Sequence, residues 1–438
     1  MKHPPLILRV VLAASCLSFA LAAQQLPAAF GNVSYGNTGD PYMTEGSKPS
    51  CKKMLNECGK ELSGGNYCLA ADVSAKPDAG GKCFTFSAGT KLDLQGHTIT
   101  GRVFSHVDAQ GAHIFNGTVT CDYADRNGDA GCVTISASSP PYLDKPAELH
   151  HLTIRNMAAN AVSRGIFVDW KPREQKARFG VRIYNTTIST PTCMLEPNTV
   201  CIRVNAVRVQ SEKAVALGLE AFNNDWTCSA DTNACQGLEL FEVGNSHIHH
   251  NRITMALNLL PETGRAIDCD GDHIPGSKNC EVDQNYIIAN NHRAFRVRSS
   301  ANAHFHDNYV ANCMNTVSGC VYLYDQGSVP EDYGDMRIER NTFEMNGGVA
   351  LFLRCGKGAV VRDNVIKGSG ERDVTGLFAN VTSWGEGCTT DATFLRNGIV
   401  ADPNIKVTSN APATAAATVC DSGVVQGTGR IVEQKDCP

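Results

Sequence analysis

The segment Thr90-Lys-Leu-Asp-Leu-Gln-Gly-His-Thr-Ile-Thr-Gly101 shows the pattern on which the chain is built. Leu92, Leu94 and Ile99 alternate with polar residues, and Gly96 interrupts the alternation. Alternation at period two is typical of β-strands that bury one side. The segment therefore predicts two short strands that are joined by a tight turn at Gly96.

The same pattern returns downstream at intervals of about 20–35 residues. Each unit has the form apolar-x-apolar-x-x-Asn-x-apolar, and five of its asparagines are Asn251, Asn285, Asn308, Asn341 and Asn364. Units that stack in register would bring these asparagines into one ladder, in which each side chain bonds to neighbouring backbone. We therefore interpret them as turn residues of a solenoid and not as catalytic groups.

The Gly96 stretch and the Asn-centred units together resemble right-handed parallel β-helix repeat proteins of the pectate-lyase-like superfamily. The resemblance covers roughly residues 83–397 and implies an all-β solenoid. It also implies an extracellular carbohydrate-active protein, because the superfamily includes polysaccharide lyases, glycoside hydrolases, uronan epimerases and non-catalytic binding proteins. Fold alone does not decide among these functions.

The ends of the chain differ from the repeats. Residues 1–23 have a basic start, an apolar run and the small-residue site Ala20-Leu-Ala22, which predict a secretory signal and a secreted or periplasmic protein. An uncleaved anchor is the alternative reading, and no later segment is apolar enough to span a membrane. We expect an arm and cap over 24–82 with a short helix at 51–62, β-helix repeats over 83–410, and a C-terminal cap over 411–438.

Composition limits the compartment and the partners. The chain has 19 cysteines and a net charge of -5. An exported protein with many cysteines and no CxxC favours disulfides over zinc. We expect the local pairs Cys121/Cys132, Cys193/Cys201, Cys228/Cys235, Cys269/Cys280, Cys313/Cys320, Cys355/Cys388 and Cys420/Cys437, and two pairs among Cys51, Cys58, Cys68 and Cys83. The acidic balance argues against nucleic acid as a partner. We expect a monomer whose partner is a polysaccharide, either as substrate or as ligand.

A second strand follows each Asn unit, and its outward side chains supply the candidate site. Period two places Ile267 and Phe295 inside and leaves the alternate residues outside. Neighbouring strands lie about 4.8 Å apart, so the outward residues form a stripe. The candidate catalytic residues of this stripe are Glu239, Asp268, Arg296, Arg298, Tyr322 and Tyr324.

The stripe is compatible with three kinds of function. The first is a polysaccharide lyase that acts on a uronate-containing glycan by β-elimination. Arg296 and Arg298 would grip the substrate carboxylate, and Tyr322 or Tyr324 would transfer the proton. The second is a glycoside hydrolase with a Glu239 and Asp268 carboxylate pair. The third is a binding protein, and an ion-pair stripe without any ligand is also possible.

Two acidic segments suggest Ca²⁺ as a cofactor. Alternate oxygen ligands occur in Asp125-Arg-Asn-Gly-Asp129 and in Asp268-Cys-Asp-Gly-Asp272. The candidate ligands are Asp268, Asp270 and Asp272 in one segment, and Asp125, Asn127 and Asp129 in the other. Solvated turns are the alternative interpretation. We interpret the histidines His247, His249, His250, His304 and His306 mainly as surface residues, although metal binding by them remains open.

Overall fold

The structure is a computed structural model of the 438-residue chain. It describes residues 51–434 apart from 77–80, 106–108, 122–130, 138–144, 157–161, 171–178, 191–202, 212–216, 230–234, 258–263, 271–278, 299–301, 316–318, 325–334, 355–357, 369–373, 376, 382–388, 400–404, 410–413, 423–424 and 428–429. Within these residues the protein is all-β and contains no helix.

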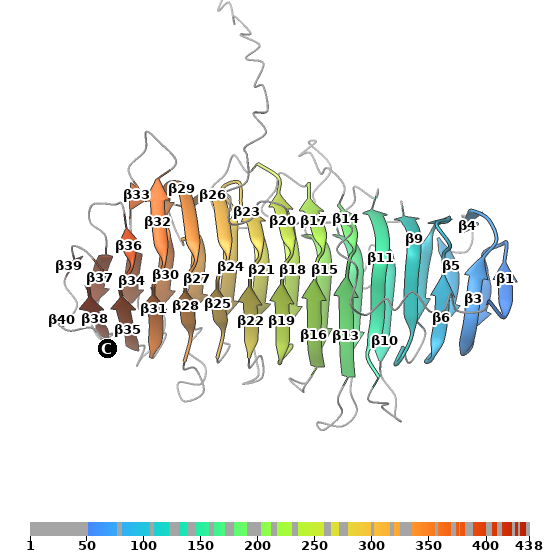
Figure 1. Ribbon diagram of the computed structural model, residues 1–438, viewed down its shortest axis with the longest axis horizontal. Helices are drawn as coiled ribbons and strands as arrows, with labels where there is room; N and C mark the ends of the chain where they lie inside the picture. The colour runs from blue at the N-terminus through green and yellow to red at the C-terminus, as the bar shows by residue number, and fades with distance from the viewer. Residues whose placement is uncertain are drawn as a thin grey trace, which may run out of the picture.

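The strands are stacked along the long axis of the molecule, with β1 at one end and β40 at the other (Figure 1). Most coils contribute three strands, and the strands pair in parallel with their counterparts in the next coil. In one coil, β18 pairs with β21, β19 with β22, and β20 with β23. The repeat pattern of the sequence therefore corresponds to a parallel solenoid, as predicted.

One strand of each coil belongs to a separate sheet, here called sheet B. Its strands are β2 (Lys60–Leu62), β5 (Lys82–Phe86), β8 (Arg102–Ser105), β10 (Val133–Ala137), β12 (Val162–Trp170), β15 (Arg203–Ser211), β18 (Cys235–Phe241), β21 (Arg265–Asp270), β24 (Arg293–Arg298), β27 (Val321–Tyr324), β30 (Leu351–Arg354), β34 (Leu377–Val381), β37 (Ile405–Ser409) and β39 (Val425–Gly427).

The other strands form sheet A, which has two rows. The first row contains β1 (Lys53–Leu55), β3 (Gly65–Leu69), β6 (Thr90–Asp93), β9 (His113–Cys121), β11 (Ala147–Asn156), β13 (Phe179–Tyr184), β16 (Leu217–Phe222), β19 (Ser246–His249), β22 (Cys280–Asp283), β25 (His304–His306), β28 (Arg337–Glu339), β31 (Ala359–Arg362), β35 (Thr389–Leu395), β38 (Thr414–Cys420) and β40 (Arg430–Glu433).

The second row of sheet A follows a sharp turn after the first row, and the long strands β9 and β11 run through both rows. Its other strands are β4 (Val73–Ser74), β7 (Thr98–Thr100), β14 (Thr187–Ser189), β17 (Asp225–Cys228), β20 (Arg252–Met255), β23 (Tyr286–Ile288), β26 (Tyr309–Asn315), β29 (Thr342–Val349), β32 (Val365–Gly368), β33 (Val374–Thr375) and β36 (Gly398–Ile399).

The segment around Gly96 folds as its alternation predicts. Leu92, Leu94 and Ile99 are completely buried, and β6 and β7 flank the turn. Gly96 has a φ of 80°, a left-handed conformation that glycine adopts without steric cost. Apolar side chains of successive coils pack on one another inside the solenoid, so a continuous core runs along its axis.

An asparagine ladder lines the turn between the two rows of sheet A. In each step the backbone N–H and side-chain Nδ2 of one asparagine donate to Oδ1 of the next, at 2.8–3.1 Å. The ladder contains Asn224, Asn251, Asn285, Asn308, Asn341, Asn364 and Asn397, all of them buried. The predicted structural role of these asparagines is confirmed.

The helix that we expected at 51–62 is wrong, because this segment forms the short strands β1 and β2. Parallel pairing with β3 and β5 satisfies its backbone, and disulfides join Cys51 to Cys68 and Cys58 to Cys83. Met54, which the helical pattern placed on the apolar face, is 52% exposed. The sheet ladder therefore outweighs the local helical pattern, and parallel strands extend into both 24–82 and 411–438.

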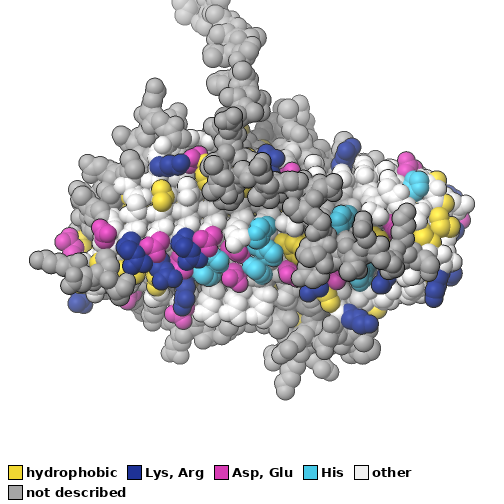
Figure 2. Space-filling view, viewed as in Figure 1, with side chains coloured by type: hydrophobic (Ala, Val, Ile, Leu, Met, Phe, Trp, Pro, Cys, Tyr) yellow, Lys and Arg dark blue, Asp and Glu magenta, His cyan; other side chains and the backbone are white. Residues whose placement is uncertain are grey.

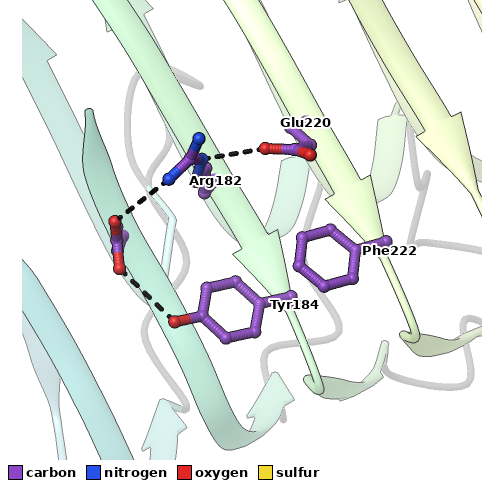
Figure 3. A pocket seen from close by; sticks show the side chains of 5 residues that line it. Arg182, Tyr184, Glu220 and Phe222 are labelled. Atoms are coloured by element: carbon purple, nitrogen blue, oxygen red, sulfur yellow. Dashed lines mark hydrogen bonds and ion pairs between the residues drawn. The ribbon is translucent and has the colours of Figure 1, made fainter. Parts of the chain in front are cut away.

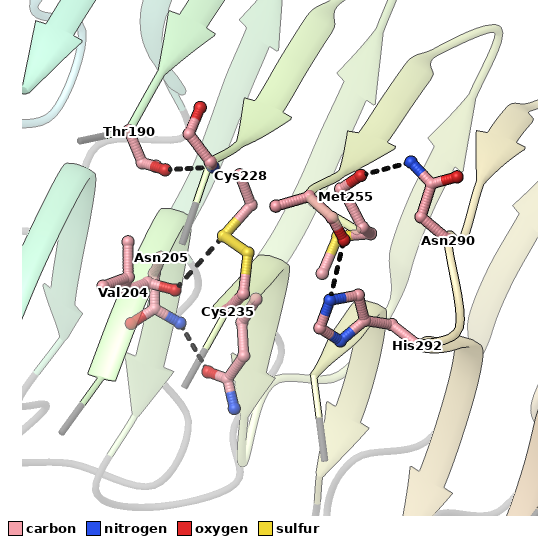
Figure 4. The surroundings of a disulfide bond; sticks show 11 residues. Thr190, Val204, Asn205, Cys228, Cys235, Met255, Asn290 and His292 are labelled. Carbon is pink, nitrogen blue, oxygen red and sulfur yellow. Dashed lines mark hydrogen bonds between the residues drawn. A yellow bond between two sulfur atoms is a disulfide. The ribbon is translucent and has the colours of Figure 1, made fainter. Parts of the chain in front are cut away.

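Disulfides join neighbouring strands along the solenoid. Four of the predicted local pairs are present: Cys121/Cys132, Cys228/Cys235, Cys269/Cys280 and Cys313/Cys320. Figure 4 shows the Cys228–Cys235 bond, which links β17 to β18. The predicted partners Cys193/Cys201, Cys355/Cys388 and Cys437 lie outside the described residues. Among the described residues, no helix is long and apolar enough to cross a membrane.

Candidate functional site

The outer side of sheet B carries the predicted stripe. Glu239 on β18 lies in register with Asp268 on β21, Asp268 with Arg296 on β24, and Arg296 with Tyr322 on β27. Since parallel pairing without a bulge preserves the facing of side chains, these four residues are successive neighbours. The structure therefore brings the predicted stripe together. Asp270 and Arg298 form a second, adjacent line.

Arg296 is the centre of an ion-pair network. Its Nε donates to Oδ1 of Asp268 at 2.7 Å, and its Nη2 donates to Oδ2 of the same carboxylate at 2.8 Å. Nη2 also donates to Oδ2 of Asp270 at 2.5 Å. Asp268 is completely buried, and Arg296 is 6% exposed. The Arg296 guanidinium is therefore engaged by carboxylates of the protein itself.

Two further arginines complete the network. Nη1 of Arg265 donates to Oδ2 of Asp268 at 2.9 Å, and Nε of Arg298 donates to Oδ1 of Asp270 at 2.8 Å. All four carboxylate oxygens thus accept hydrogen bonds from guanidinium groups. Ca²⁺ binding at Asp268 and Asp270 would require these arginines to leave, so the geometry of this pair does not fit the cation.

The other predicted calcium ligands lie outside the described residues. They are Asp272 in one segment and Asp125, Asn127 and Asp129 in the other. The side chain of Tyr324 also lies outside, although its backbone is in register with Arg298. Calcium binding by Asp272, Asp125, Asn127 and Asp129 therefore stays a prediction.

Burial and charge shift the pKa values of the network in opposite directions. Burial alone would raise the pKa of Asp268, but Arg296 and Arg265 outweigh it and lower that pKa. Burial and the neighbouring Asp268 raise the pKa of Asp270. Burial would lower the pKa of Arg296, yet the two aspartates raise it above its usual value. Asp268 and Arg296 therefore form a firmly ionised pair.

These shifts bear on the hydrolase interpretation. A glycosidase needs one carboxylic acid that stays protonated near neutral pH. Asp268 has a lowered pKa, so it is not suited to be that acid. Glu239 is 3% exposed and accepts hydrogen bonds from Arg208 at 2.6 Å and Asn205 at 2.9 Å. The two carboxylates are committed to ion pairs.

Arginines outnumber carboxylates on this part of sheet B. The described side chains of β15, β18, β21, β24 and β27 include five arginines and three carboxylates. The arginines are Arg208, Arg265, Arg293, Arg296 and Arg298, and the carboxylates are Glu239, Asp268 and Asp270. Burial, Arg265 and Arg296 lower the pKa of Arg293 to about 10, and its guanidinium lies 5.0 Å from the ring centre of Tyr322. Among the described side chains of these five strands, arginines therefore exceed carboxylates by two.

The outer side of the first row of sheet A has a different character, which sequence reasoning missed. A ladder of stacked rings runs along it, with centres 4.7–5.2 Å apart and planes within 14° of parallel. Its members are Phe115, His150, Tyr184, Phe222 and His249. Figure 2 shows histidines gathered on this side, with basic and acidic side chains alternating toward the C-terminal end.

A hollow of about 240 Å³ lies beside the ring ladder and is lined by Glu148, Arg182, Tyr184, Glu220 and Phe222. Figure 3 shows Arg182 held between carboxylates: its Nε donates to Glu220 at 2.8 Å, and its Nη1 is 3.7 Å from Glu148. The Tyr184 hydroxyl donates to Glu148 at 3.3 Å. The sequence did contain a signal for this hollow. Each Asn-centred unit has a polar residue between two apolar ones, and this position places Arg182 and Glu220 on the same side of neighbouring strands.

Parallel coils, a shared core and the buried asparagine ladder define the class of the protein as a right-handed parallel β-helix. Comparison with family models agrees: residues 270–410 match the model described as the right handed beta helix region. No curated protein and no solved structure gave a match. The predicted fold and resemblance are therefore confirmed.

Proposed function

We propose that this protein binds an acidic glycan through the arginine-rich face of sheet B. The observation that carries the proposal is the excess of five arginines over three carboxylates on five neighbouring strands. The whole chain has a net charge of -5, so this local excess runs against the overall balance. A row of guanidinium groups suits the regularly spaced carboxylates of a uronate polymer.

Exposure separates the residues that would touch the glycan from those that support them. The side chains of Arg298 and Arg265 are 18% and 17% exposed, whereas that of Asp268 is completely buried. Nε of Arg298 and Nη1 of Arg265 each donate to an aspartate, and a guanidinium carries five N–H donors in all. Arg298 and Arg265 would therefore contact the ligand, while Asp268, Asp270 and Arg296 hold them in place.

The disulfides of the protein are compatible with a compartment in which it would encounter an extracellular ligand. Six disulfides among the described residues are compatible with an oxidising environment, either extracellular or periplasmic. Residues 1–23, as a secretory signal, would deliver the chain there. A polysaccharide outside the cell is the class of polyanion that such a surface would meet.

β-Elimination is the second candidate function, and one contact favours it. The Arg293 guanidinium lies over the Tyr322 ring, and Tyr322 is in register with Arg296. Arginine and tyrosine are the residue types that a β-elimination needs to hold the substrate carboxylate and to transfer the proton. Arg298 and Tyr322 lie on the paired strands β24 and β27, so a uronate bound by Arg298 would lie on the same strand pair as this tyrosine.

One experiment separates the two functions. The purified mature protein is mixed with a panel of uronate polymers and with a neutral glucan, and both retention on the polymer and the ultraviolet absorbance of an unsaturated product are followed. Retention on a uronate polymer that weakens with salt, without a rise in absorbance, supports binding. A rise in absorbance that Tyr322→Phe abolishes supports β-elimination. Equal retention on the neutral glucan, or no retention on any polymer, overturns the proposal.

A further inference from the structure

We propose that His113, Glu148 and His150 form a binding site for a divalent transition metal of the zinc class on the outer side of sheet A. One ligand atom from each of the three side chains lies within 4.8 Å of the other two. A Zn²⁺ ion with bonds of about 2.0–2.1 Å holds its ligands about 3.3 Å apart. Small side-chain rotations therefore close the site.

Rigid strands place the three ligands. Glu148 and His150 are two residues apart on β11 and face the same side, and Glu148 lies in register with His113 on β9. Oε2 of Glu148 is 3.6 Å from Nδ1 of His113. Because both strands belong to the continuous ladder of sheet A, the arrangement does not depend on a loop.

Neighbouring groups prepare the ligands for a metal. Nδ1 of His150 lies at hydrogen-bond distance, 2.9 Å, from Nδ1 of His151. A metal bond through Nε2 of His150 requires the tautomer in which Nδ1 of His150 carries the proton and donates it to His151. A metal-bound histidine must be neutral. The centres of the His113 and His150 rings lie 6.5 Å apart.

The site would be open on one side. Three protein ligands leave at least one coordination position, as in catalytic zinc sites. Glu148 also lines the hollow of about 240 Å³ in which Arg182 and Tyr184 lie. The fourth ligand would enter from this hollow, and Arg182 would favour an anionic group such as a carboxylate. The chemical class of the ligand is thus a metal ion together with a small anion.

Positive charge near the site opposes the metal and offers a way to test it. Nη1 of Arg182 is 3.7 Å from Oε1 of Glu148. Removing this charge in Arg182→Gln should strengthen metal binding, since a cation would no longer compete for the carboxylate. A surface histidine that binds metal nonspecifically would not respond to this change.

The experiment uses the mature full-length protein with Co²⁺ as a spectroscopic probe and Zn²⁺ as competitor. His304→Ala and His306→Ala are introduced first, because Glu281, His304 and His306 form a second possible cluster. In this background we expect one Co²⁺ per chain, a visible absorption band, and its loss when Zn²⁺ is added.

The decisive variants are His150→Phe and Glu148→Gln. Phenylalanine keeps the ring that stacks between Phe115 and Tyr184 but lacks the nitrogen ligand. We expect each variant to weaken Co²⁺ binding by about 100-fold or more, since outer partners alone are worth about 10- to 100-fold. His249→Phe is the matched control, because His249 belongs to the same ring ladder but not to the cluster.

The outcomes are clear in either direction. Loss of the Co²⁺ band in both decisive variants, with the band kept in His249→Phe and strengthened binding in Arg182→Gln, supports the site. Unchanged Co²⁺ affinity in correctly folded His150→Phe and Glu148→Gln, or no Co²⁺ binding by the parent protein, overturns it. Circular dichroism establishes that each variant is folded.

Discussion

The outer side of sheet B and the outer side of the first row of sheet A are built on the same ladder, but they use polar groups differently. On sheet B, arginine and aspartate side chains are buried and bonded to one another around Arg296. On sheet A, histidines and ring edges lie at a partly open surface beside a hollow. A solenoid fixes which residues are neighbours, and the chemistry of each column then decides how many of its polar side chains are buried in bonds to one another.

The largest expected effect follows from breaking the closed network. Asp268→Ala leaves Arg296 and Arg265 buried without their shared partner. Removing one member of a buried ion pair costs about 3–5 kcal/mol of unfolding free energy, which urea denaturation measures. Asp363→Ala is the control, because the side chain of Asp363 is 34% exposed and it pairs with the exposed Arg396. An equal loss of unfolding free energy in both variants would contradict the expected difference between a buried and an exposed ion pair.

A somewhat smaller effect is expected in the asparagine ladder, the closed polar column inside sheet A. Asn285→Ala removes the oxygen that accepts from the backbone N–H and side chain of Asn251. Each buried donor left without a partner costs about 1–3 kcal/mol, so we expect a loss of about 3 kcal/mol in the free energy of unfolding. Asn66→Ala, on the partly exposed part of β3, should change little. Similar losses at both positions would show that the ladder adds no stability.

Lowering the pH should reduce the free energy of unfolding through His150 on the outer side of sheet A. The pKa of His150 falls from 6.5 to about 3 in the folded protein, mainly because of burial. Below pH 6.5 His150 binds a proton in the unfolded chain but not in the folded chain. Its contribution to the free energy of unfolding is therefore present at neutral pH and is lost as the pH falls toward 3. Between pH 7 and pH 5 the loss is about 2 kcal/mol. His150→Phe should remove this part of the pH dependence, and an unchanged dependence would show that His150 titrates normally.

The sequence predicted the stacking of coils well, because period-two alternation and recurring asparagines determine the register of a solenoid. It therefore placed Glu239, Asp268, Arg296 and Tyr322 side by side. It could not predict that the Arg296 guanidinium would donate its hydrogen bonds to two aspartates, because those bonds depend on side-chain geometry between strands. At 51–62 it predicted a helix, since Leu55 and Leu62 fit a helical face as well as two strands.

The hollow on sheet A escaped prediction for a related reason. Arg182 and Glu220, which meet there, are 38 residues apart, and the intervening segments differ in length from coil to coil. Every unit has such a polar position, so the sequence did not indicate which coils would form the hollow. Only the register of β11, β13 and β16 shows that Glu148, Arg182 and Glu220 are consecutive.

The most direct test of the proposed function compares one arginine from each face by binding to a soluble oligouronate. Arg298→Gln removes a partly exposed guanidinium from sheet B, and Arg396→Gln removes an exposed one beside the ladder turn of sheet A. Calorimetry at low and high salt gives the dissociation constant of each variant. We expect Arg298→Gln to weaken binding about tenfold, as the loss of one charge-assisted contact of about 1.4 kcal/mol, and Arg396→Gln to leave it unchanged. Equal affinity in the two variants would contradict glycan binding on sheet B.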